Sequence, residues 1–309
     1  MTNPSAPPVP TPSGSIYDLG YRGYDGPRLG RQHAVTALFT HSVKSCYGIG
    51  RGGRAKIVPI ALGAIAVLPA VVAVGIIALA RQAGEAGEFI SDASPIRYDT
   101  YYGSVAQIVA LFCAAQAPEL LGRDQRYSVL SLYFSRALER TDYALAKLGG
   151  FVAALLVLVL LPQAVIFIGL TLSSADLVEG LADNLPEVLP ILAQGITLAL
   201  LFGSLSLAIA AFTPRRAYAT AGIIAAFIVP PIVAEIAHEA TSRDVARWLV
   251  LASPPDVVGA TNALFFGVPA ESRTIIAARQ PDELYLAVAA VAIIVLTAIL
   301  LRRYQRIAA

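Results

Sequence analysis

Long apolar runs recur along this chain, and each approaches or exceeds the ~18 residues at which a helix can cross a bilayer. Only 14% of the 309 residues are charged, whereas a typical soluble domain carries about 25%. Water therefore does not surround much of the folded surface. We predict an all-α, polytopic membrane protein with six transmembrane helices, at residues 57–80, 101–121, 148–172, 188–212, 217–237 and 284–301.

The second of these runs is the weakest, because it contains Gln107, Gln116, Pro118 and Glu119. Its centre is apolar, and its polar side chains are expected to face other helices rather than lipid. With this span included, most of the 23 Lys and Arg residues fall in segments on the same side as the N-terminus. Basic residues concentrate in cytoplasmic loops, so both termini are expected to be cytoplasmic.

The segments outside the spans differ in composition. Residues 1–15 are rich in Pro and Ser, which is typical of a disordered tail. Residues 16–56 are expected to form a cytoplasmic arm, in which 28–47 has the spacing of an amphipathic helix on the inner leaflet; a solvated helix is the alternative. The remaining divisions are a transmembrane domain (57–301), its external loop (238–283) and a basic cytoplasmic tail (302–309).

Two loops are expected to contain helices of their own. The loop from Gly122 to Lys147 is too polar to span and has apolar side chains among its arginines, which favours a short cytoplasmic helix parallel to the membrane. Such a helix can press on a soluble partner while it stays joined to two spans. In the external loop, Pro254-Pro255 ends one predicted helix, and a second is predicted from Asp256 to Phe265.

The sequence lacks the common catalytic motifs. It contains no G-x-x-x-x-G-K-[ST] phosphate loop, no H-E-x-x-H zinc motif and no G-x-S-x-G nucleophile motif. Cys46 and Cys113 give no basis for a disulfide framework or a metal site, and the net charge of +2 does not suggest a nucleic-acid partner. We therefore expect no catalytic residue, no metal and no cofactor on this chain.

Ionisable residues near the membrane boundary are candidates for function because burying them is costly. Glu119 lies one helical turn before Arg123, so either the two pair or Glu119 sits among the lipid headgroups. Glu235 lies near His238 and Glu239, which allows a proton-responsive cluster, with interfacial solvation as the alternative.

Three sequence features together resemble a known family. The arm reads YDLGYRGYDGPRLGR from Tyr17 to Arg31, and it is similar to the YDLGYRxYxGPRLGR opening of an actinobacterial-type group of permease subunits of type-2 (exporter) ABC transporters. The loop after the second span is similar to the loop of that family, although Tyr127-Ser128 and Ala137 depart from its usual Gly-Thr and Pro. Ser253-Pro254 matches an SP pair that follows the fifth span in the family.

The resemblance implies a division of labour between subunits. A separate ABC ATPase, which would carry the ATP and Mg, would bind beneath the loop, and a second permease subunit would complete a homo- or heterodimer in the bacterial plasma membrane. Arg215 and Arg216 would make a second cytoplasmic contact. The ATPase-coupling residues that it implies are Asp124, Arg126, Ser135, Arg136, Arg140, Asp142 and Lys147.

Two other readings compete with an exporter subunit. A self-sufficient ion- or proton-coupled secondary transporter predicts charges at the membrane midplane and an internal repeat, and the sequence has neither. A membrane anchor would not need so elaborate a loop, and an intramembrane enzyme lacks a plausible nucleophile and base. The scarcity of charge within the spans favours an amphiphilic cargo, such as a lipid, drug or peptide.

Overall fold

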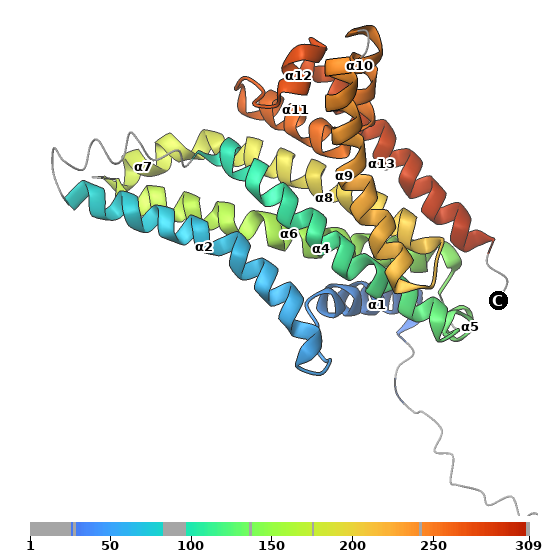
Figure 1. The fold of residues 1–309 in the computed structure, drawn as a ribbon. Coiled ribbons are helices and arrows are strands. Elements are labelled where there is room, and N and C mark those ends of the chain that lie inside the picture. Colours follow the sequence, from blue (N-terminus) through green and yellow to red (C-terminus); the bar gives the residue numbers. More distant parts are fainter. Residues whose placement is uncertain are drawn as a thin grey trace, which may run out of the picture.

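A computed structural model describes residues 26, 29–82, 97–135, 138–174, 176–240 and 243–306, and this part of the chain folds into helices without a strand (Figure 1). The first 15 residues and the Tyr17–Arg28 part of the arm motif lie outside this description, apart from Gly26. The helices, including the 3-10 turns η1 and η2, are α1 (Gly30–Cys46), α2 (Arg54–Gln82), α4 (Tyr98–Arg126), α5 (Leu130–Phe134), α6 (Arg140–Ser173), α7 (Leu177–Asn184), η1 (Leu185–Glu187), α8 (Val188–Ala211), α9 (Arg216–Ala240), α10 (Arg243–Leu249), η2 (Val250–Ala252), α11 (Pro254–Phe266), α12 (Arg273–Ala278) and α13 (Asp282–Gln305).

Six of the described helical segments are long and apolar enough to cross a membrane, and they coincide with the six predicted runs. They are α2, α4, α6, α7 continued through η1 into α8, α9 and α13. The weakest run in the sequence, now α4, is the most buried of the six. Gln116 and Pro118 both lie inside the bundle. Gln116 is polar and Pro118 lacks an amide proton, so both are better placed against protein than against lipid.

Helix α6 is the centre of the bundle and packs against α1, α2, α4, α8 and α13 (Figure 1). Its buried Phe151 stacks on Phe112 of α4, with ring centroids 6.5 Å apart, and Gly203 brings α8 close to the same ring. The closely packed α4–α6–α8 core leaves α2, α9 and α13 with one face each for lipid, where large apolar side chains are exposed.

The arm helix α1 lies against α6. Leu38, Ser42 and Cys46 form its buried side, and Tyr47 Oη donates a hydrogen bond to the Ala154 carbonyl oxygen (2.7 Å). The apolar face predicted for a membrane surface is thus largely covered by protein, and its placement on the inner leaflet stays a prediction.

Both described ends of the chain lie at the same end of the bundle, where α6 begins. Arg31 of α1 pairs with Glu139 and Asp142, and the Arg140 guanidinium donates to the carbonyl oxygen of Gln305 (2.9 Å) at the end of α13. We call this the α5 end. Its assignment to the cytoplasm stays a prediction from the basic residues.

The segment between α9 and α13 forms a helical cap over the opposite end of the bundle (Figure 1). The two helices predicted there are present, and Ser253 Oγ accepts a hydrogen bond from the Asp256 amide (3.4 Å) at the start of α11. Residues 245–252 and α11 meet at 90°, a shape that fits either a broken span or a re-entrant loop. Helix α12 has no counterpart in the sequence prediction.

Gly150 is the closest point of contact between α6 and α1, because a Cβ there would come within 2.6 Å of Ser42 Cβ. Gly150→Ala should push α1 away from α6, since overpacking typically costs about 1–3 kcal/mol. Burial raises the pKa of the Cys46 thiol to about 12, and thiolate is the form that reacts. In a Cys113→Ala background at pH 8, we expect maleimide to label Cys46 about tenfold faster in Gly150→Ala than in the parent.

Gly149→Ala is the matched control, because its new Cβ would meet the Phe39 ring at an ordinary 3.5 Å. Equal labelling rates in the two variants would contradict a close α1–α6 contact at Gly150.

Candidate functional site

The α5 end is built on a buried ion pair. Lys147 Nζ of α6 lies 2.8 Å from Asp124 Oδ2 of α4, and the Lys147 side chain is only 3% exposed. Tyr143 Oη donates a hydrogen bond to the same oxygen at 2.7 Å, and Lys147 also reaches the Leu120 carbonyl oxygen at 3.4 Å. A charge removed from water is stable only with such partners, so this contact fixes the end of α4 against the beginning of α6.

An aromatic cluster joins α5 and α13 to this ion pair. The Tyr143 ring contacts those of Tyr133, Phe134 and Tyr304, with centroids 5.1–5.9 Å away. Gln125 Nε2 donates to Tyr304 Oη (3.1 Å) and to the Ala211 carbonyl oxygen at the end of α8 (3.2 Å). Three spans, α4, α6 and α13, therefore meet at one buried tyrosine, Tyr143, and α5 rests on it. Helix α8 is joined to them through Gln125.

Most coupling residues predicted from the sequence make internal contacts here. The side chain of Lys147 is 3% and that of Asp124 14% exposed, so both lie largely inside the bundle and offer little surface to a partner. Asp142 accepts two hydrogen bonds from Arg31, at 2.7 and 2.8 Å. The Arg140 guanidinium lies 5.7 Å from the centre of the Phe134 ring. These contacts hold the loop in place. The sequence pattern predicts that these residues contact a partner and does not indicate this internal role.

The exposed part of the loop is smaller. Arg126 donates to the Pro214 carbonyl oxygen (3.3 Å) and Ser135 to that of Leu132 (3.0 Å), and both side chains remain exposed. Tyr127 is 68% and Leu132 66% exposed, which makes them the large apolar groups of this surface. Arg136, predicted as a coupling residue, lies outside the described residues, as does Ala137.

Glu119 does not make the ion pair with Arg123 that the sequence allowed. Its two carboxylate oxygens instead lie 3.3 Å from Arg51 Nη1 and 3.6 Å from Arg216 Nη1. The helical spacing identified a near neighbour, but it did not reveal that the α1–α2 turn and the start of α9 bring two arginines to Glu119. Arg216, predicted as a second cytoplasmic contact, is thus partly engaged.

The other predicted boundary residues have simpler surroundings. The guanidinium of Arg215 lies 5.8 Å from the centre of the Tyr218 ring. Glu235 is exposed on α9 and takes part in none of the ion pairs among the described residues. A proton-responsive cluster with His238 therefore gains no support from the geometry.

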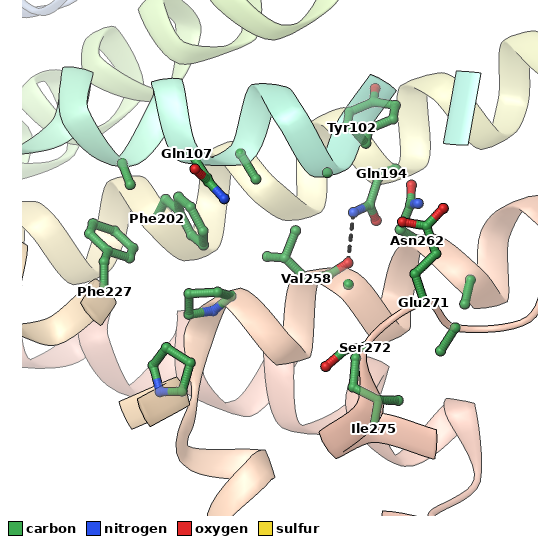
Figure 2. A pocket seen from close by; sticks show the side chains of 18 of the residues that line it. Tyr102, Gln107, Gln194, Phe202, Phe227, Val258, Asn262, Glu271, Ser272 and Ile275 are labelled. Atoms are coloured by element: carbon green, nitrogen blue, oxygen red, sulfur yellow. Dashed lines mark hydrogen bonds between the residues drawn. The ribbon is translucent and has the colours of Figure 1, made fainter. Parts of the chain in front are cut away.

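A second candidate site is a cavity of about 760 Å³ between α4, α8, α9, α11 and the segment that leads into α12. Figure 2 shows Phe202 and Phe227 at one end and Tyr102, Gln194, Asn262 and Glu271 at the other. Gln194 Nε2 donates to the Val258 carbonyl oxygen (2.9 Å), which ties α8 to α11 across the cavity wall. The volume lies within the range of about 300–1,000 Å³ that is common for small-molecule sites.

Sequence reasoning noticed Gln107 in this wall but not the cavity. Two further amides line the same cavity, Gln194 in α8 and Asn262 in α11, and only the fold brings them together. Neither the protein-family models nor the curated proteins compared with this chain match it. Within the described ranges, no group of three or more His, Cys, Asp and Glu side chains is placed to hold a metal ion.

The ion pair beneath α5 should behave as a buried pair. Lys147→Met leaves Asp124 charged without its partner, a change that typically costs about 3–5 kcal/mol. Adding Asp124→Asn should restore much of the loss, because the Asn side chain still accepts from Tyr143 and no charge remains. Thermal unfolding in mild detergent measures both effects.

Lys44→Met removes an exposed lysine from α1 and is the control. A double variant as unstable as Lys147→Met alone would show that the two side chains are not coupled.

Proposed function

We propose that this chain is the permease subunit of an ATP-driven exporter of the type-2 ABC superfamily in the bacterial plasma membrane. It forms the translocation pathway, and a separate ATPase subunit hydrolyses ATP. The family proposal comes from the arm and loop motifs. The observation that carries the mechanism is the contact between α5 and Tyr143. Through this tyrosine the exposed surface of α5 is joined to α4, α6 and α13.

Helix α5 is suited to transmit force because it is short and rests on buried side chains. A partner that presses on Tyr127 and Leu132 moves a helix that cannot slide past Tyr143 without disturbing the Lys147–Asp124 pair. Protein interiors are densely packed and transmit such displacements. In this proposal Arg126 and Arg140 border the ATPase contact, while Asp142 and Lys147 hold its base.

The cavity supports a route for cargo. It is lined by α4 and α9, and Leu111, Ile224, Ile228 and Ile232 on these helices are exposed apolar side chains of the lining. A second permease subunit that covered this face would enclose the cavity between two copies. The second copy would then supply the part of the cavity wall that the six spans of one chain leave open.

The secondary-transporter alternative gains less from the geometry. It needs ionisable groups near the membrane midplane, whereas the ion pairs of the described spans lie near helix ends: Lys147–Asp124 and the Glu119 pairs at the α5 end, and Arg97–Asp99 at the other. A proton or ion therefore has no charged relay through the described part of the bundle.

Purification from the native cell in mild detergent tests the proposal directly. We expect an ABC ATPase to co-elute in stoichiometric amount and the complex to hydrolyse ATP. A folded, monodisperse protein that elutes without an ATPase would overturn the proposal and make proton-coupled flux the next measurement.

The contact itself is tested by Leu132→Asp, which places a charge in the proposed apolar interface. We expect at least about a tenfold loss of ATPase association, because central apolar contacts dominate interface energies. Ile276→Asp, on an equally exposed residue of α12 at the opposite end, is the control and should leave association unchanged. Equal association of the two variants would place the ATPase elsewhere.

A further inference from the structure

The cavity between α4, α8, α9 and α11 has two chemically different ends. At the apolar end Phe202 and Phe227 pack with ring centroids 4.4 Å apart, and Ala110 and Ile228 complete the wall. The polar end contains Asn262, from α11, and Glu271, from the segment before α12, both beneath α4 in Figure 2. A ligand that satisfies both ends must itself be amphiphilic.

The charged side chains of the lining are of one sign. Asp99 and Glu271 are acidic, and no Lys, Arg or His belongs to the described lining. Asp99 is paired with Arg97 at 3.1 Å, outside the cavity, whereas Glu271 forms none of the ion pairs of the described residues. The cavity therefore presents a net negative potential to whatever enters it.

Donors at the polar end are engaged with backbone oxygens. Gln194 Nε2 donates to the Val258 carbonyl oxygen at 2.9 Å, and Asn262 Nδ2 donates to the Asp99 carbonyl oxygen at 3.0 Å. The Glu271 carboxylate is exposed, and a carboxylate can only accept. It is therefore the group at this end that calls for a donor from the ligand.

The segment that carries Glu271 is held in place from below. Ser272 Oγ and Thr274 Oγ1 donate to Asp256 Oδ1 at 3.2 and 3.0 Å, and Asp256 stands at the start of α11. The hydrogen bonds to Asp256 thus fix the turn that carries the Glu271 carboxylate, next to Asn262.

We propose that this cavity binds amphiphilic cations. A protonated amine pairs with Glu271 at the polar end, while its hydrocarbon or aromatic part lies against Phe202 and Phe227. The inference rests on the proposed function in one respect: in an exporter the bound cation is the cargo. An anionic amphiphile would meet two carboxylates and no cation in the lining, so the same site disfavours it.

The proposal is tested by measuring the binding of a probe to the purified chain in nanodiscs made of lipids without net charge. The probe is N-(5-aminopentyl)dansylamide, a cationic amphiphile whose emission increases in apolar surroundings. N-pentyldansylamide is its neutral counterpart and N-dansyl-6-aminohexanoate its anionic counterpart, and empty nanodiscs give the partition background. We expect the cation to bind most tightly and the anion most weakly.

Glu271→Gln should weaken binding of the cation about fivefold, as expected for a partly exposed charge pair, and leave the neutral probe unchanged. Glu235→Gln removes another exposed carboxylate, on α9 outside the cavity, and is the matched control. Ala110→Phe fills the apolar end and should weaken both probes. Equal affinities for cation and neutral probe, or no effect of Glu271→Gln on the cation, would overturn the proposal.

The result is separable from that of the ATPase experiment. Cation binding without a co-purified ATPase would keep the cavity assignment and reject the exporter subunit. A co-purified ATPase without charge-selective binding would keep the exporter subunit and reject amphiphilic cations as its cargo.

Discussion

The contact between Lys147 and Asp124 is the constraint on which the α5 end depends. One lysine, 3% exposed, can stay charged there only because a carboxylate and a carbonyl oxygen surround it. The same carboxylate orients Tyr143, and Tyr143 supports both α5 and the end of α13. Any movement of α5 is therefore felt by three spans at once, which is the mechanical property that a coupling element needs.

At the other end of the bundle the helices are held differently, and this difference leaves room for a ligand. Amide side chains tie α8 and α4 to α11. Gln194 of α8 donates to the Val258 carbonyl oxygen and accepts from Thr261, and Asn262 of α11 donates to the Asp99 carbonyl oxygen of α4. Between these links the walls are apolar and the cavity remains open. The α5 end is thus held by a buried ion pair and contacts between aromatic rings, whereas the opposite end is held by neutral hydrogen bonds around a cavity.

The sequence was sufficient to predict six helices that are long and apolar enough to cross a membrane, because an apolar run of ~20 residues has few alternatives to such a helix. It also located the loop helix and the helices around Pro254-Pro255, where proline and capping chemistry act locally. It was insufficient for side-chain roles. Lys147 and Asp124 looked like surface charges. For Glu119 the sequence offered a pair with Arg123 or a place among the lipid headgroups, because partners from distant segments leave no trace in local spacing.

The cavity shows the same limit. Phe227, Gln194 and Glu271 come from different elements, and nothing in the neighbourhood of any one of them indicates that they share a wall. The arm motif is the contrasting case. Its last residue, Arg31, forms ion pairs with Glu139 and Asp142. The structure therefore gives this one residue of the motif a role, which is to hold the arm against the start of α6.

That contact joins residues 111 positions apart, Arg31 and Asp142, and this has a consequence for how the protein is made. A ribosome delivers α1 well before α6 exists, so the arm helix must wait for its partner while α2, α4 and α5 are synthesised. During that interval its apolar face lacks the protein surface that covers it in the folded chain. The arm helix therefore reaches its final packing only after α6 has been made.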